Sequence, residues 1–313
     1  MIGQKLAHYR IIDVLGAGAL GTVYSAEDLN RPRLVALRIL PRELARNGEL
    51  LRRFDAILAA LAGLDHPGIV RVLERGEDQA FQFVTMPLVD GQTLEARLRP
   101  GPLPLPDAIR VATEVAEALV AIHAAGVAHT DLRPQNVMIS PRGVRLLNVG
   151  MPHDLLPASA ALARQRAPYL SPEILRGARP DGAGDLYALG VMLYEMVTGR
   201  RPFSGESPQS VARAVMEGRP DLPCSLRDGV PLSLERTILK ALAREPVGRH
   251  CDAEEFLAEL RQAGDDLNAL ELTHLPLVRR RRRHFGTLLP TLAAILFLGI
   301  ILLIARLFQL HGR

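Results

Sequence analysis

Up to Gly91 the chain follows the two-residue period of β-strands. Apolar and polar positions alternate on both sides of a glycine-rich loop in YRIIDVLGAGALGTVYSAEDL, residues 9–29, which predicts two strands joined by a turn. The runs LVALRIL (34–40) and FQFVTMPLVDG (81–91) predict two further strands, the second of which runs into a linker, with a helix-like segment at 42–62 between them. We therefore expect this part of the chain to form a small, β-rich lobe.

Beyond Gly91 the pattern changes to the 3.6-residue period of amphipathic helices. One apolar face runs through residues 107–125 and predicts a long helix, and a second helix is predicted at about 184–197. The Pro- and Gly-rich stretch LRPGPLPLPD (98–107) predicts a loop between helices. The pattern thus predicts a β-rich lobe followed by a larger helical lobe, an α+β architecture.

The run FGTLLPTLAAILFLGIILLIA, residues 285–305, contains 21 residues without a charge. At about 1.5 Å per residue, a helix of this length spans the roughly 30 Å hydrocarbon layer of a membrane, so we predict a transmembrane helix rather than a buried core helix. Five arginines at 279–283 precede the run. The positive-inside rule then predicts a single-pass protein of the cell membrane with its N-terminal part in the cytoplasm, a linker at 264–284 and a short external tail at 306–313.

The charge outside this C-terminal part argues against nucleic acid as a partner. Seven of the 38 Lys and Arg residues, and no acids, lie at 279–313, which leaves 31 basic against 34 acidic side chains before them. The two cysteines, Cys224 and Cys251, lack the spacing of a zinc site or a disulfide framework.

Gly16, Gly18 and Gly21 match the pattern G-x-G-x-x-G. A dinucleotide-binding loop would open a helix, whereas residues 22–24 continue the β-pattern, so that interpretation is excluded. Two interpretations remain open from the residues alone: a hairpin whose backbone N–H groups cover phosphates, and a plain glycine-rich turn.

Four later segments complete a larger pattern: HTDLRPQNVMIS (129–140), NVG (148–150), YLSPE (169–173) and DLYALGVMLYEMVTGRRPF (185–203). With the glycine loop and VALR (35–38), their order and spacing resemble the protein kinase superfamily, particularly the bacterial Ser/Thr kinases of eukaryotic type. The resemblance covers about residues 8–263 and implies a two-lobed fold with a small lobe at 8–87 and a helical lobe at 91–263. It also implies an ion pair between Glu173 and Arg249.

The resemblance implies a nucleotide site and a catalytic loop. The nucleotide-binding residues that it implies are Gly16, Gly18, Gly21, Val23, Ala36, Arg38, Met86 and Val89. The catalytic Asp falls at Asp131, with Arg133 in the place of the family's Lys two residues later. The two metal-ligand positions fall at Asn136 and Asn148.

Three departures from the family pattern affect its chemistry. Arg38 stands at the phosphate-binding Lys, and Ile57 stands at the Glu that should pair with it. Asn148 stands at the metal-binding Asp of the DFG motif. Magnesium prefers charged oxygen ligands, so ATP is a possible ligand while magnesium binding is expected to be weak.

Two further departures concern the activation segment. Thr130 replaces the Arg of the HRD motif, and Arg166 falls where the family has a substrate-loop Thr. Between Gly150 and Tyr169 only Ser159 carries a hydroxyl group. Switching by phosphorylation of this loop is therefore not expected.

Two hypotheses from different functional classes follow. The sequence favours a pseudokinase: a membrane-tethered signalling protein that binds a nucleotide or serves as a scaffold for protein partners not yet identified. The alternative is a weak or unorthodox Ser/Thr protein kinase that transfers the γ-phosphate of ATP to protein hydroxyls, with Arg38 and Asn148 in place of Lys and Asp.

Overall fold

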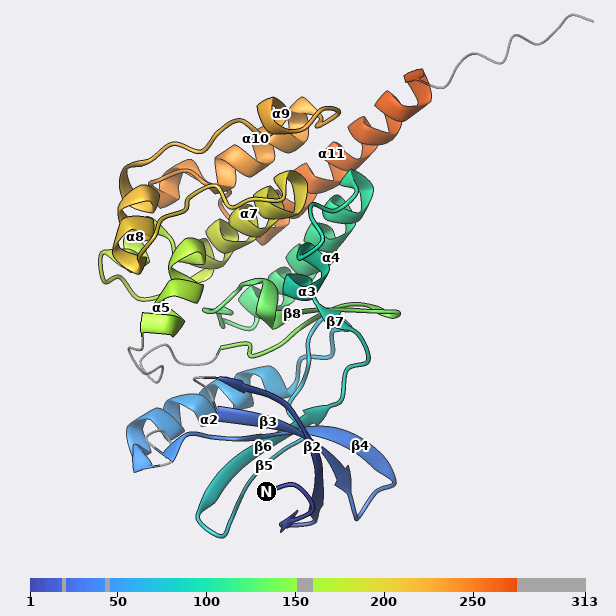
Figure 1. Ribbon diagram of the computed structural model, residues 1–313, viewed down its shortest axis with the longest axis vertical. Coiled ribbons are helices and arrows are strands. Elements are labelled where there is room, and N and C mark those ends of the chain that lie inside the picture. The colour runs from blue at the N-terminus through green and yellow to red at the C-terminus, as the bar shows by residue number, and fades with distance from the viewer. Residues whose placement is uncertain (19–20, 43–45, 151–159, 275–313) are drawn as a thin grey trace, which may run out of the picture. The chain divides into compact units, whose positions relative to one another are not determined.

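The computed structural model describes residues 1–18, 21–42, 46–150 and 160–274. A β-rich lobe is followed by a larger helical lobe, so the two-lobed α+β architecture predicted from the sequence is confirmed (Figure 1). Both lobes belong to one compact unit, Met1–Leu270.

The small lobe contains a six-stranded antiparallel sheet with the order β1-β2-β3-β4-β6-β5. Its strands are β1 (Lys5–Leu6), β2 (Tyr9–Gly18), β3 (Gly21–Asp28), β4 (Arg33–Ile39), β5 (Glu74–Asp78) and β6 (Phe81–Pro87). The register places Gly16, Val23, Arg38, Val84 and Arg75 opposite one another in a single row across five strands. Because directly opposed residues share a face of a sheet, this row lies on one face.

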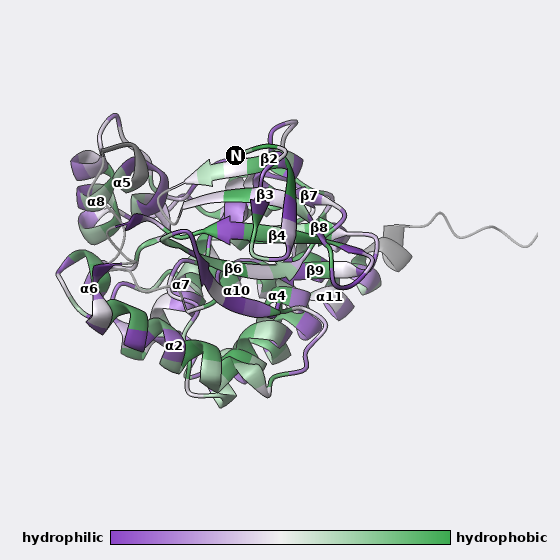
Figure 2. Cartoon of the chain, turned by 90° about the horizontal axis from the view of Figure 1, so that it is seen from below, coloured by the Kyte–Doolittle hydropathy of each residue, from purple (hydrophilic) through white to green (hydrophobic). Residues whose placement is uncertain are grey.

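The helix of the small lobe, α2 (Gly48–Ala62), follows a break at Asn47, and Arg42 and Arg46 before the break are also helical, so the described residues of the helix-like segment expected at 42–62 are helical apart from Asn47. Asn47 is the reason for the break, because its side chain accepts the N–H groups of Glu49 and Leu50 and caps the helix there. Much of α2 is hydrophobic (Figure 2), yet Phe54 is its only fully buried residue. The other apolar residues of α2 are therefore incompletely covered.

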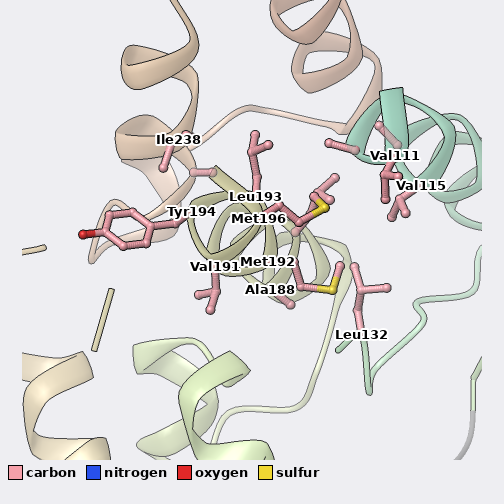
Figure 3. Packing of buried hydrophobic residues seen from close by; sticks show 14 of the residues in the cluster. Val111, Val115, Leu132, Ala188, Val191, Met192, Leu193, Tyr194, Met196 and Ile238 are labelled. Carbon is pink, nitrogen blue, oxygen red and sulfur yellow. The ribbon is translucent and has the colours of Figure 1, made fainter. Parts of the chain in front are cut away.

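Helix α7 (Gly182–Thr198) forms the centre of the helical lobe. It begins at its cap Asp181, which accepts the N–H of Gly184, and ends at Gly199 in the left-handed conformation. Almost every residue of α7 is buried, and Figure 3 shows its side chains between those of α4 (Leu105–Ala124) and α10 (Leu232–Ala241). The two helices predicted in this lobe, at 107–125 and 184–197, are thus confirmed within two residues at each end.

The remaining elements surround this core. They are α3 (Leu94–Leu98), α5 (Ala160–Arg166), α6 (Pro172–Leu175), α8 (Pro208–Glu217), α9 (Pro223–Leu226), α11 (Ala253–His274) and the 3₁₀ turns Pro134–Asn136, Ala167–Tyr169 and Pro246–Gly248. A second antiparallel sheet has the order β7 (Gln92–Thr93), β8 (Val137–Ser140) and β9 (Gly143–Leu146). Val137 pairs with Leu146, so the residues just before β8 and just after β9 lie at the same end of this sheet.

The expected ion pair between Glu173 and Arg249 is present. Nη1 and Nη2 of Arg249 each donate to a different carboxylate oxygen of Glu173 at 2.7 Å, a bidentate geometry. Burial alone would raise the pKa of Glu173, but the hydrogen bonds from Arg249 lower it overall. The guanidinium also lies 5.0 Å from the ring centre of Tyr187, and this ties the segment 169–173 to α7.

Within the part of the chain that the structure describes, no helix is long and apolar enough to span a membrane. The predicted span at 285–305 and the arginine run at 279–283 both lie outside that part.

Candidate functional site

Asp185, at the start of α7, fixes the loop that carries Asp131. Its carboxylate is almost completely buried and accepts the backbone N–H groups of His129 at 2.7 Å and Thr130 at 2.9 Å. Thr130 has φ of +69°, a left-handed conformation that such anchoring holds in place. Asp185 was not identified as a site residue from the sequence; the available signal was a carboxylate at the head of the otherwise apolar run LYALGVML.

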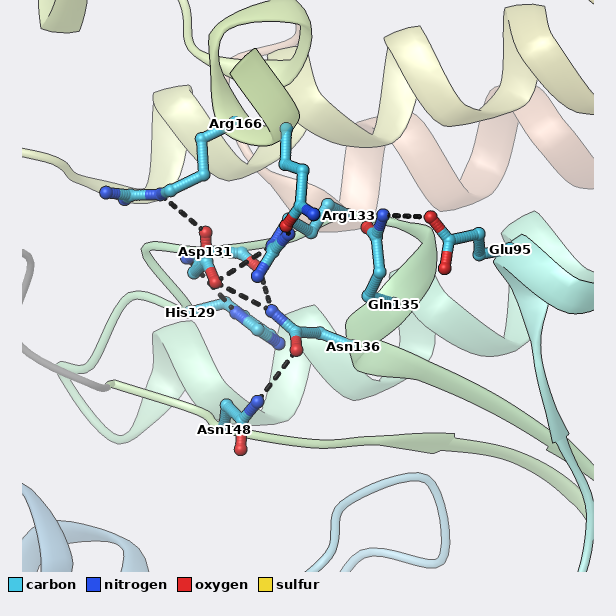
Figure 4. Close-up of polar contacts among 9 residues, drawn as sticks. Glu95, His129, Asp131, Arg133, Gln135, Asn136, Asn148 and Arg166 are labelled. Atoms are coloured by element: carbon cyan, nitrogen blue, oxygen red, sulfur yellow. Dashed lines mark hydrogen bonds and ion pairs between the residues drawn. The ribbon is translucent and has the colours of Figure 1, made fainter. Parts of the chain in front are cut away.

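The carboxylate of Asp131 accepts three side-chain donors (Figure 4). Oδ1 accepts Nε of Arg166 at 2.8 Å. Oδ2 accepts Nε of Arg133 at 3.1 Å and Nδ2 of Asn136 at 2.8 Å. Only 5% of the Asp131 side chain is exposed, so these donors restrict the access of a substrate hydroxyl to the carboxylate.

Arg166 is the unexpected member of this group. The sequence placed it in the activation segment, but gave no signal that it would form an ion pair with Asp131. Its side chain is 11% exposed and comes from the last residue of α5. Burial lowers the pKa of Arg166 while the charge of Asp131 opposes that shift. Ser159, the one candidate phosphorylation site named from the sequence, lies outside the described residues.

The two predicted metal positions are adjacent and bonded to each other. Nδ2 of Asn148 donates to Oδ1 of Asn136 at 2.7 Å, and Nδ2 of Asn136 also donates to the backbone oxygen of Asp131 at 2.6 Å. Oδ1 of Asn148 is buried without a hydrogen-bond partner, and Asn148 itself has φ of +63°. The structure thus brings the two residues together.

This donor set does not fit a magnesium ion. Both side chains at the metal positions are neutral, and the nearby carboxylate of Asp131 is already balanced by two arginines. Their amide oxygens carry no net charge, and that of Asn136 already accepts a hydrogen bond from Asn148. Among the described residues there is also no group of three His, Cys, Asp or Glu side chains that could hold a metal.

Arg38 is a buried cation without a counter-charge. It is 8% exposed, forms no ion pair or hydrogen bond with the described residues, and its Nε is buried without a partner. Burial lowers the pKa of Arg38 to about 10, so the guanidinium stays protonated at neutral pH. An anionic group such as a phosphate fits this position, because it would supply the missing charge and accept the free N–H groups.

The structure also explains why α2 supplies no partner to Arg38. A Cβ atom on Gly150 would lie 2.4 Å from Cγ2 of Ile57, so Ile57 packs against the glycine of the NVG segment. Asp55, the nearest carboxylate on α2, pairs with Arg75 at 3.0 Å instead. An apolar contact thus joins the helix to the NVG segment, and an ion pair that does not involve Arg38 joins it to strand β5 of the sheet.

The other predicted nucleotide residues lie on or beside the same sheet. Gly16 and Gly18 have open space around them, whereas a Cβ on Gly21 would lie 1.8 Å from the backbone oxygen of Ile39, so Gly21 allows the strands to approach. Val23 lies directly opposite Arg38 in the register. The three remaining residues are Ala36 and Met86, which are buried and directly opposed, and Val89, half-buried just beyond β6.

Comparison with known proteins agrees with this arrangement. Residues 9–246 match the family model described as a protein kinase domain. The chain is 35% identical over 274 residues to a probable serine/threonine-protein kinase of Clostridium perfringens, covering 86% of this chain and 40% of that protein. It is 33% identical over 273 residues to the serine/threonine-protein kinase PrkC of Bacillus subtilis, covering 85% of this chain and 42% of that protein. The chain therefore spans about two fifths of the length of these curated relatives.

Among solved structures, the kinase domain of PknI from Mycobacterium tuberculosis is similar, with a TM-score of 0.67 and 27% identity. The similarity covers 84% of this chain and 98% of that domain.

Because Arg38 is a buried cation without a counter-charge, its removal is expected to raise the free energy of unfolding. Replacing it with an apolar side chain of similar length, Arg38→Met, should stabilise the ligand-free protein, because it removes an uncompensated buried cation. A pKa depression of the size seen at Arg38 corresponds to on the order of 3 kcal/mol, so we expect a gain of about 1–3 kcal/mol in the free energy of unfolding. Chemical denaturation of the full chain would measure it.

Arg75→Met is the matched control, since Arg75 lies in the same row of the sheet but is paired with Asp55. This variant should lose stability or leave it unchanged. A loss of stability in Arg38→Met would show that Arg38 has a stabilising partner in the ligand-free protein.

Proposed function

The chain belongs to the protein kinase family, and from this premise we propose that it is a binding module of the kinase fold that holds a nucleotide without a metal ion and does not transfer phosphate. One observation carries the proposal: Arg133 and Arg166 close the carboxylate of Asp131, while both metal positions are neutral amides bonded to each other. The lone cation at Arg38 supports the retention of anion binding.

Phosphoryl transfer in this family depends on positioning and electrostatic stabilisation, so missing charges have large effects. Loss of one preorganised electrostatic contact typically costs about 10²–10³ in rate. Here Ile57 leaves Arg38 without an organising partner, and Asn148 supplies no charge to a metal. Magnesium, where it is bound in this family, neutralises charge on the phosphates; among the nucleotide-binding residues named above, Arg38 is the one cation that could take this part.

Nucleotide binding rests on features that need no metal. The open space at Gly16 and Gly18 leaves room for phosphates beneath the hairpin, and Arg38 faces the same side of the sheet as Val23. The opposed pair of Ala36 and Met86 limits the depth of the apolar part of the site. These contacts suit an adenine base and its phosphates bound with modest affinity.

A Ser/Thr protein kinase is the second candidate. Asp131 is retained, and the curated relatives are named as serine/threonine-protein kinases. For transfer to occur, Arg166 would have to leave Asp131 so that a substrate hydroxyl could take its place.

We also propose that residues 285–305 tether this module to the cell membrane with the kinase-like domain in the cytoplasm. The uncharged length of that run and the five arginines before it support the proposal. A tethered module that does not transfer phosphate would act through protein partners, and their identity is open.

The nucleotide proposal predicts metal-independent binding. ATP should raise the melting temperature of the full chain by a similar amount in EDTA and in magnesium, because binding to the folded state alone stabilises it. The increase in melting temperature that ATP causes should be smaller in Arg38→Met. A rise that requires magnesium would mean that the site assembles a metal, and no rise under either condition would leave a module that does not bind nucleotide.

The tethering proposal predicts a defined topology. A reporter fused before Met1 should be cytoplasmic and one fused after Arg313 should lie outside, as measured by protease access to intact cells. Replacing the arginines at 279–283 with uncharged residues should weaken the preference for this orientation in the membrane. Degradation of the kinase-like domain by external protease would contradict the orientation.

A further inference from the structure

A cavity of about 680 Å³ lies between α2 and the face of the sheet that carries Arg38. Apolar residues from several elements line it, among them Phe54, Leu58, Ile69, Val84, Met86 and Val149. The glycine loop, Val23 and Val89 are not part of its lining, so it lies behind Met86 and not where the adenine would bind. Its volume falls in the range of about 300–1,000 Å³ that is typical of small-molecule sites.

We propose that this cavity binds an amphipathic monocarboxylate, a small molecule with one carboxylate group on an apolar body, whose carboxylate pairs with Arg38. This goes beyond the nucleotide proposed above and does not depend on it. The ligand would supply the negative charge that Ile57 fails to supply from α2.

The charges around the cavity identify the head group. Arg38 is nine-tenths buried and has no partner among the described residues. Arg75 pairs with Asp55 at 3.0 Å, and Arg33 pairs with Asp28 at 3.0 Å. Arg31 and Arg71 also line the cavity, but both are exposed to solvent. A single unpaired buried cation matches a single negative charge, and the planar guanidinium matches the two oxygens of a carboxylate.

The wall formed by α2 identifies the body of the ligand. Of the fifteen residues of this helix only Phe54 is fully buried, although the helix is rich in apolar side chains (Figure 2). Leu58 and Leu61 are only half-buried and line the cavity. An apolar body in the cavity would remove these side chains from water, which favours binding in proportion to the area covered.

Arg38 and Met86 line the cavity and also belong to the predicted nucleotide site. A carboxylate on Arg38 would take the cation that the phosphates of ATP require. The two ligands should therefore weaken each other's binding by the same factor, as linkage demands.

The test uses 4-phenylbutanoate as the probe and 4-phenylbutan-1-ol as its uncharged counterpart, each titrated calorimetrically into the full chain without nucleotide. We expect the acid to bind at least tenfold more tightly than the alcohol, since a charge-assisted pair with a buried guanidinium is worth about one to two powers of ten in affinity. In Arg38→Met the acid should lose this advantage while the alcohol binds as before. Acetate and inorganic phosphate, which lack the apolar body, should not bind measurably.

A second variant keeps Arg38 and fills the cavity. Leu58→Phe should weaken both the acid and the alcohol, and Arg75→Met should leave the preference for the acid intact. Equal binding of acid and alcohol to the wild type, no binding of the acid, or unchanged acid binding in Arg38→Met would overturn the proposal. Binding of acetate or phosphate as tight as that of the acid would also overturn it, since the site would then recognise a small anion alone.

Discussion

A guanidinium buried without a counter-charge is the constraint on which this site depends. Desolvation makes a lone charge expensive in a protein interior, and a fold keeps one only if packing elsewhere offsets the cost. In the described part of this chain the cost falls on Arg38, because α2 presents Ile57 to the NVG segment and directs Asp55 to Arg75. The position of Arg38 is thus prepared for an anion that the chain itself does not provide.

The site as a whole has an excess of positive charge. Three cations, Arg38, Arg133 and Arg166, stand against one carboxylate, Asp131, and the two residues at the metal positions are neutral. Such a balance attracts phosphates or carboxylates and offers little to a divalent cation. Asp185 and the pair of Glu173 with Arg249 keep the surrounding loops in place, so the fold is retained although Ile57 and Asn148 are uncharged.

The sequence predicted the features that depend on local pattern. The helices α4 and α7 follow from apolar periodicity, and the pair of Glu173 with Arg249 follows from the spacing of family motifs. The break at Asn47 before α2 was not predicted, because the cap at Asn47 is a short-range signal inside a helix-like stretch. The contact of Arg166 with Asp131 joins residues 35 positions apart through the reach of a long side chain, which no periodicity reports. The cavity beneath α2 likewise depends on how completely side chains fill space, and only the folded structure determines that.

Transfer of labelled phosphate from ATP to a generic basic protein by the full chain is the most direct test of a site that binds anions without reacting. Asp131→Asn serves as the blank, because it removes the one carboxylate that could accept a hydroxyl proton while keeping the shape of the side chain. A site closed by Arg133 and Arg166 and lacking a charged metal ligand predicts no transfer above that blank. Clear transfer by the wild type that disappears in Asp131→Asn would contradict it and establish an active Ser/Thr kinase.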